Sequence, residues 1–285
     1  MTAPLWSRVL FRFSRALCVL DVSQQIVRDE LLFAFLEPAQ RGALTLDAYS
    51  KNSKYLPGGE VFSAGLFSWE SALLDHSSVP RSGAVLLAAA GGGRELQALL
   101  QRGYEVYAFE PVASLLESAR TIAQGAKATV MKATYRDLVE HARGCSGPLD
   151  GLRGPFDLCV LGWGSLSHLT EPDEVVAVLR ALRTLAPRAP VMTSFFVRRA
   201  GPTPTGGGAR KLRRFLRRAL GATGGHSVAP GLQFLNSAGF MYAFTRDELL
   251  GLCDRAGYAV AHFNDSDYAH ALLVPKEASP TTEAA

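Results

Sequence analysis

The feature that most constrains the fold is an alternation of short apolar runs and helical patterns that begins near residue 83. The apolar runs are continuous, as is typical of parallel strands buried on both faces. Helical patterns separate them, as in strand–helix–strand units. The expected strands are 84–90, 105–109, 128–133, 156–161 and 190–197, and the expected helices are 94–102, 113–124, 136–143 and 173–185. This order predicts an open, doubly wound α/β domain.

The alternation changes near the C-terminus. Thr245, followed three residues later by Glu248, is a capping-box pattern that opens a helix ending near Gly257. Segments 258–263 and 269–274 then flank a polar turn and indicate a hairpin. We therefore expect two antiparallel strands to complete a seven-stranded, mostly parallel sheet.

The pattern divides the chain into three parts. Residues 83–275 form the expected α/β domain, residues 1–82 an N-terminal helical and aromatic cap segment, and residues 276–285 a disordered tail. No stretch approaches the roughly 20 uninterrupted apolar residues of a membrane span. The four cysteines are far apart and form no C-x-x-C pair, which favours reduced thiols in the cytoplasm over disulfides or a metal site.

Two helices are expected within the first 36 residues. Residues 5–20 have helical apolar spacing interrupted by arginines, which excludes a signal-peptide core. This segment is interpreted as an amphipathic helix packed on the body, with a membrane-surface helix as the alternative. Ser23 is expected to cap a second helix that ends near Leu36, before Pro38.

Residues 49–70 are rich in glycine, serine and aromatic side chains. Such a segment is typical of a loop that folds over a ligand. A plain connecting loop whose aromatic residues pack on the core remains the alternative.

The most informative motif is the run Gly91–Gly93, which joins a strand to a helix. Glycines there let the backbone approach a ligand, and the helix N-terminus adds unpaired N–H groups. Glu110 stands at the end of the next strand, where a carboxylate can accept hydrogen bonds from both ribose hydroxyls. Together these features favour a nucleoside site over a simple tight turn.

This combination resembles the class I methyltransferases that use S-adenosylmethionine (SAM). In that family an acid, a short spacer and a G-x-G-x-G follow the first strand. The resemblance covers roughly residues 83–275 and implies SAM as cofactor and S-adenosylhomocysteine (SAH) as product. The implied cofactor residues are Ala89, Gly91 and Gly93 at the methionine, Glu110 at the ribose, Pro111, Thr134 and Tyr135 at the adenine, and Gly162 and Trp163 where cofactor and acceptor meet.

The sequence departs from the family pattern at two positions. Leu87 stands in the place of the acid and Ala89 in the place of the first glycine. Alanine is small enough to keep the turn. Without the acid, the methionine amino group needs a backbone carbonyl or a residue of the N-terminal segment such as Tyr55. Weak cofactor binding or a non-catalytic relative is the alternative that this departure leaves open.

The loop 162–168 is expected to lie between cofactor and acceptor, because ligands of such folds bind outside the carboxyl ends of the strands. His168 is the candidate general base, since histidine titrates near neutral pH; a merely hydrogen-bonded histidine is the alternative. Trp163 either stacks on a ligand or fills the floor of the pocket. Further acceptor-side candidates are Tyr49, Trp69, Ser165, Phe196 and Arg199.

Residues 198–225 form a basic insertion with eight basic residues and no acid, although the whole chain has a net charge of only +4. Its helical segment is expected to place Leu212, Phe215, Leu216 and Leu220 on one face. A solvated helix, a lid facing an anionic acceptor, and contact with nucleic acid or an anionic membrane are the three interpretations. No aromatic residues alternate with the arginines, which disfavours RNA. We expect a mobile lid over the acceptor site.

The expected function is methyl transfer from SAM to an O, N or S atom of a small-molecule acceptor, such as a specialised metabolite. The alternatives are methylation of RNA or a peptide side chain, and a non-catalytic SAM-binding relative. The asparagine- and proline-containing tetrapeptide typical of enzymes that methylate amino groups of nucleic acids is absent, which argues against methylation of an exocyclic base amino group.

Overall fold

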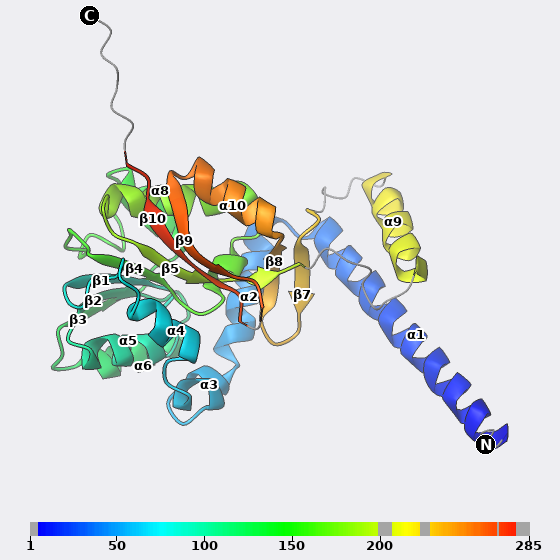
Figure 1. The fold of residues 1–285 in the computed structure, drawn as a ribbon. Helices are drawn as coiled ribbons and strands as arrows, with labels where there is room; N and C mark the ends of the chain where they lie inside the picture. Colours follow the sequence, from blue (N-terminus) through cyan, green and yellow to red (C-terminus); the bar gives the residue numbers. More distant parts are fainter. Residues whose placement is uncertain (1–4, 199–206, 223–228, 267, 278–285) are drawn as a thin grey trace, which may run out of the picture.

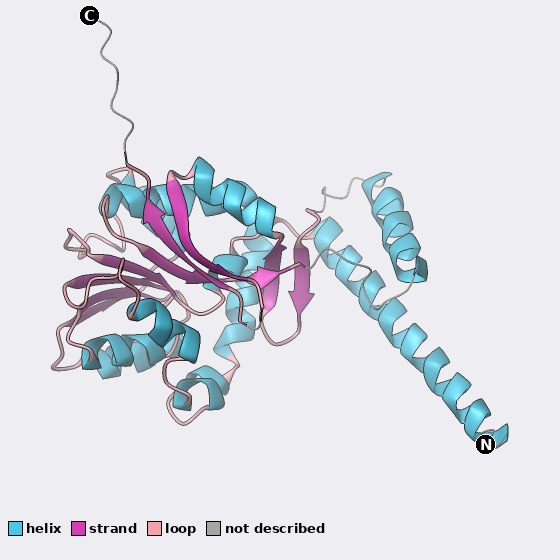
Figure 2. Cartoon of the chain, in the orientation of Figure 1, coloured by secondary structure: helices cyan, strands magenta, loops and turns pink. Residues whose placement is uncertain are grey.

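A computed structural model of the chain describes residues 5–198, 207–222, 229–266 and 268–277. Seven strands form the central sheet in the order β3-β2-β1-β4-β5-β10-β9 (Figures 1 and 2). They are β1 Ala84–Ala88, β2 Glu105–Phe109, β3 Ala128–Met131, β4 Leu158–Leu161, β5 Val191–Ser194, β9 Tyr258–Asn264 and β10 His270–Pro275. The first five are parallel, and β10 is antiparallel to both β5 and β9. The predicted mostly parallel sheet with a terminal hairpin is confirmed.

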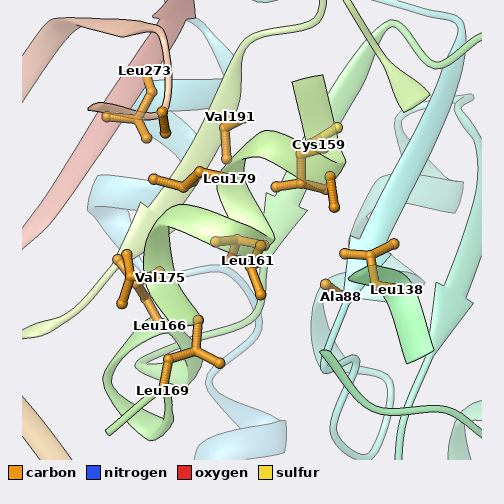
Figure 3. Packing of buried hydrophobic residues seen from close by; sticks show 14 of the residues in the cluster. Ala88, Leu138, Cys159, Leu161, Leu166, Leu169, Val175, Leu179, Val191 and Leu273 are labelled. Carbon is orange, nitrogen blue, oxygen red and sulfur yellow. The ribbon is translucent and has the colours of Figure 1, made fainter. Parts of the chain in front are cut away.

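The strands are continuously apolar because helices cover both faces of the sheet. In β1, Leu86 and Ala88 belong to one hydrophobic cluster, whereas Val85 and Leu87 belong to the other. Figure 3 shows part of the first cluster, around Leu161, Leu179 and Val191. Its helices are α7 Tyr135–Ala142, α8 Pro172–Leu185 and α10 Arg246–Arg255; those of the second are α4 Ser68–Leu74, α5 Arg94–Gln101 and α6 Ala113–Ala123.

A second sheet of three strands was not predicted. It consists of β6 Phe196–Val197, β8 Gly239–Phe244 and β7 Leu232–Leu235, in the order β6-β8-β7. The single strand expected over 190–197 is therefore divided between the two sheets. β8 is buried along its whole length, and the Phe240 N–H donates to the Thr45 hydroxyl at 2.9 Å. This bond attaches the small sheet to the N-terminal segment.

The N-terminal segment is more helical than predicted. α1 runs without a break over Leu5–Phe35, so the predicted cap at Ser23 is wrong. The Ser23 hydroxyl instead donates to the Val19 carbonyl one turn earlier, as serines inside helices do. Pro38 does follow the end of α1, but it also begins α2 (Pro38–Ser50), because a proline in the first turn loses no helical hydrogen bond.

Residues 38–63 are called the cover below. They comprise α2, the short 3-10 helix η1 (Ser53–Tyr55) and α3 (Glu60–Ser63). The boundaries of the cap segment at residue 82 and of the tail at residue 276 stay predictions. Residues 278–285 of that tail lie outside the described part of the chain.

The first half of α1 points away from the sheet instead of packing on it (Figure 1). α9 (Gly207–Ala222), from the basic insertion, lies along α1, and Arg217 of α9 pairs with Glu30 at 2.8 Å. Phe215, expected on the apolar face of this helix, is 66% exposed. None of the described helices is both long enough and apolar enough to cross a membrane.

Candidate active site

A cavity of about 300 Å³ lies at the carboxyl ends of β1, β2 and β4 and is covered by residues 38–62. It brings together eleven of the residues predicted for the site: Tyr49, Tyr55, Ala89, Gly91, Glu110, Pro111, Thr134, Tyr135, Trp163, Ser165 and His168. No described residue of α9 lines it, so α9 is not the predicted lid over the acceptor site. Residues 199–206 and 223–228 of the predicted lid lie outside the described part of the chain. The cover takes the place that was expected for α9.

The backbone of the loop after β1 turns sharply and lets other groups approach it closely. Ala89, Gly91 and Gly93 have φ values of 54°, 57° and 98°. Glycine adopts this left-handed region freely, whereas alanine pays about 1–2 kcal/mol. A Cβ on Gly92 would stand 2.0 Å from the Tyr55 carbonyl oxygen. The loop therefore both turns into α5 and receives the backbone of the cover.

Gly93 and Gly162 support the loop without lining the cavity. A Cβ on Gly93 would meet the Ile122 side chain at 2.6 Å, and one on Gly162 would meet the Ala89 carbonyl oxygen at 2.2 Å. Both glycines thus let neighbouring elements pack closely. Their direct contact with a cofactor stays a prediction.

Glu110 is buried where β2 ends. Its carboxylate accepts the N–H of Gly91 at 2.8 Å and that of Val112 at 2.9 Å. Burial raises the pKa of Glu110 to about 7, although the two N–H bonds act to lower it. Each carboxylate oxygen keeps a lone pair for a ligand in the cavity.

The loops after β3 and β4 meet beside Glu110. The Tyr135 and Ser165 hydroxyls lie 2.6 Å apart, and burial raises the pKa of Tyr135 above its usual value. Thr134 caps α7, since its hydroxyl accepts the Asp137 N–H and donates to the Asp137 carboxylate at 2.7 Å. Thr134 and Tyr135 are thereby held in place at the cavity wall.

A buried ion cluster, which was not predicted from the sequence, ties residues 65–70, just after the cover, to the start of α5 beside the glycine loop. Arg94 donates to Glu70, Glu95 and the Gly65 carbonyl, each at 2.6 Å. Glu95 also accepts the Trp163 N–H at 3.1 Å. Arg94 and Glu95 both line the cavity. The available signal was a pair of opposite charges directly after three glycines.

Tyr49 and His168 form a pair at the other end of the cavity. The Tyr49 hydroxyl lies 2.9 Å from His168 Nε2, and His168 Nδ1 lies 3.0 Å from the Phe240 carbonyl oxygen. Because a carbonyl only accepts, Nδ1 carries the proton and Nε2 accepts from Tyr49. Burial lowers the pKa of His168, so the ring is neutral at pH 7, and burial raises the pKa of Tyr49. His168 is thus hydrogen-bonded and also faces the cavity.

The wall around this pair comes from segments that are distant in the sequence. It includes Thr45 and Leu46 of α2, Thr170 and Glu174 near the start of α8, and Phe240 of β8. None of these was predicted, because no local motif marks them. Glu174 is exposed to solvent, and partial burial of its carboxyl group raises its pKa.

Two predicted acceptor residues lie elsewhere. Trp69 is buried in the second hydrophobic cluster and stacks on His270 at a centroid distance of 4.9 Å. Phe196 is exposed on β6, and its ring blocks the space beside Gly164. Neither of them lines the cavity. Arg199 lies outside the described residues.

No family model matches the sequence, and no curated protein matches it. Solved structures do match. The 1,6-didemethyltoxoflavin-N1-methyltransferase of Burkholderia thailandensis, with bound 1,6-didemethyltoxoflavin and SAH, is 19% identical with a TM-score of 0.55, over 85% of this chain and 92% of that one. A SAM-dependent methyltransferase from Leishmania major is 14% identical with a TM-score of 0.53, over 84% of this chain and 85% of that one. Another from Methanosarcina mazei is 16% identical with a TM-score of 0.51, over 75% of this chain and 100% of that one.

The chain has the class I methyltransferase fold. Within it, Leu87 is fully buried among the sheet's apolar residues and does not line the cavity. The site therefore holds no acid at that place. Among the described carboxylates that line the cavity, Glu95 and Glu110 stand at the glycine loop.

Proposed function

We propose that the chain is a SAM-dependent methyltransferase that methylates an O, N or S atom of a small-molecule acceptor. The observation that carries the proposal is that one cavity extends from the glycine loop and Glu110 to the Tyr49–His168 pair. Two ligands that share such a space are held in reacting geometry while water is excluded. Methyltransferases of the same fold, such as the one from Burkholderia thailandensis, support it.

The residues present fit SAM. In this proposal Glu110 offers lone pairs to the ribose hydroxyls, and Pro111 and Tyr135, which line the same cavity, flank the adenine. Glu95, held by Arg94 and the Trp163 N–H, supplies the carboxylate for the methionine ammonium that Leu87 does not. When bound, SAM supplies a methyl group on a positively charged sulfur.

The acceptor end favours a small, neutral molecule. The cover forms its wall, which limits access for a macromolecule. Arg94 is committed to Glu70 and Glu95, and Glu174 adds a carboxyl group. The other cation of the described lining, Arg136, directly follows Tyr135 on the side proposed for the adenine, so the acceptor end offers little for an anionic acceptor. This favours a neutral acceptor over the anionic one considered from the basic insertion.

Tyr49 and His168 are the proposed proton path. An acceptor O–H or N–H donates to the Tyr49 oxygen, while the Tyr49 proton moves to His168 Nε2. The Phe240 carbonyl holds the ring in the tautomer that this transfer needs.

The cytoplasm is the proposed compartment, supported by four free cysteines.

Calorimetry with SAH and 5′-methylthioadenosine, which lacks the amino-acid part, tests the cofactor site. Glu110→Gln is expected to weaken the binding of both ligands about 10- to 100-fold, the scale of hydrogen bonds to a charged group. Glu95→Gln is expected to weaken the binding of SAH alone. Glu105→Gln, at the exposed opposite end of β2, is the matched control. Wild-type protein that binds neither ligand, or unchanged affinity in Glu110→Gln, contradicts the proposal.

A non-catalytic SAM-binding protein is the second candidate, favoured by Leu87. The purified protein, incubated with cell extract and SAM labelled in its methyl group, separates these two candidates. An enzyme yields a labelled product that Glu110→Gln abolishes, whereas a binding protein yields none at any SAH affinity.

A further inference from the structure

α1 carries a row of exposed apolar side chains on one face. Phe13, Leu20, Val27, Leu31 and Phe35 are 60%, 59%, 37%, 42% and 55% exposed. Their spacings of seven and four residues place them on one side of the helix. The row, called the apolar stripe below, is about 33 Å long at 1.5 Å per residue.

In the second half of α1 the opposite face is the one that packs, whereas Val19, earlier on that face, is 64% exposed. Ile26, Glu30 and Phe33 are almost fully buried, and Phe33 contacts Phe240 of β8. Glu30 is paired with Arg217 of α9. The internal packing of the fold therefore does not explain the apolar stripe, and no described residue covers it.

α9, which lies along α1, is strongly basic. Lys211, Arg213, Arg214 and Arg218 are exposed, and none of them forms an ion pair with an acid of the described chain. Phe215 lies among them at 66% exposure. α9 lies next to α1 (Figure 1), so these exposed cations are on the helix next to the one that carries the apolar stripe.

We propose that the α1–α9 pair docks on an anionic membrane surface. The apolar stripe enters the boundary between headgroups and acyl chains, and the α9 cations pair with lipid phosphates. A second copy of the chain fits less well, because it brings the same positive charge to the contact. A nucleic acid leaves the apolar stripe without a partner, since its outer surface is phosphate.

Flotation of the full chain with vesicles tests this. The wild-type protein is expected to float with vesicles of phosphatidylcholine and phosphatidylglycerol, less so in high salt, and not with phosphatidylcholine alone. Arg213→Gln, Arg214→Gln and Arg218→Gln together are expected to weaken binding about a hundredfold, at roughly fivefold per cation. Leu20→Ser and Leu31→Ser are each expected to weaken it at least about fivefold.

Matched controls separate docking from general charge or folding effects. Lys127→Gln, Lys132→Gln and Arg188→Gln remove three exposed cations from the body, and Leu44→Ser changes a leucine that is 46% exposed on α2. Both controls are expected to float as the wild type does, and all variants to keep the wild-type thermal unfolding transition.

Five results overturn the proposal. The first three are no flotation with anionic vesicles, equal flotation with neutral vesicles, and equal loss of flotation in the control variants. The other two are a dimer that Leu20→Ser dissociates while vesicles are not bound, and tight RNA binding without flotation.

Discussion

At the scale of single residues, Glu110 couples ligand binding to pH. Burial raises its pKa to about 7, and ribose hydroxyls donate best to its charged form. We predict that SAH affinity falls as the pH decreases through 7, approaching about tenfold per pH unit. Calorimetry in buffers of different ionisation enthalpy measures the proton released on binding. In Glu110→Gln this pH dependence is expected to vanish, and its persistence would assign it to another group.

The raised pKa of Glu110 also makes the stability of the fold depend on pH. A carboxyl whose pKa is raised in the native state holds its proton more tightly there than in the unfolded chain. The stability from this group is therefore fully present below its usual pKa of 4.5 and is lost as the pH rises through 7. The loss amounts to about 3 kcal/mol, at 1.36 kcal/mol per pKa unit. Denaturant unfolding from pH 4 to 8 is expected to show a steeper decline in wild type than in Glu110→Gln.

Ala89 is a residue in a conformation that suits glycine. Its φ of 54° costs about 1–2 kcal/mol, while a glycine costs about 0.5–1 kcal/mol in unfolded-state entropy. We predict that Ala89→Gly leaves the free energy of unfolding unchanged or raises it by up to about 1 kcal/mol. Ala90→Gly is the control, because Ala90 is buried and lacks the positive φ, so it is expected to destabilise. A larger loss in Ala89→Gly than in Ala90→Gly would show that the Ala89 methyl group is needed for packing.

At the scale of elements, Gly92 determines how the cover sits on the glycine loop. An alanine there would bring its Cβ within 2.0 Å of the Tyr55 carbonyl, so η1 must move away. We predict that Gly92→Ala weakens SAH binding at least about tenfold and makes residues 49–63 more sensitive to limited proteolysis. Gly91→Ala, where a Cβ meets nothing within 4 Å, is expected to leave η1 in place. Equal protease sensitivity in the two variants would contradict this role.

The elements that were predicted are those whose signal is local. Continuous apolar runs predicted the five parallel strands, and the capping box at Thr245 predicted α10. The unpredicted elements depend on distant partners: β7 and β8 pair with each other and with β6, and β8 is held by Thr45 of α2. Pro38 was interpreted only as a stop, although the same proline begins α2.

The two ends of the site differ in the same way. The end at the glycine loop was predicted because Gly91 and Glu110 follow consecutive strands of one sheet, which brings them together. The acceptor end joins α2, α8 and β8, and only His168 and its partner Tyr49 were predicted there, as separate candidates. Their contact spans 119 residues of sequence and leaves no periodic or local pattern.

At the scale of the whole molecule, the proposed cavity and the proposed membrane contact occupy different parts of the fold. The cavity is formed by the cover and the strand ends, whereas α1 and α9 extend from the body beside β7 (Figure 1). Thr45, Phe33 and Phe240 join the two parts, because α1 and α2 both pack on β8. Phe13, Val19 and Leu20, among the described side chains of the first half of α1, are exposed, so this half is expected to open locally more often than the sheet.

Hydrogen exchange tests this separation in one experiment. Without ligands, the amides of residues 13–25 and 207–222 are expected to exchange faster than those of β1, β4 and β8, because exposed helices with few buried contacts open at low free energy. SAH is expected to slow exchange in the glycine loop and the cover and to leave α9 unchanged. Anionic vesicles are expected to slow exchange in α9 and to leave the glycine loop and the cover unchanged. If SAH protects α9 as strongly as the cover, the two parts respond as one unit, and the basic helix then belongs to the machinery of the cavity.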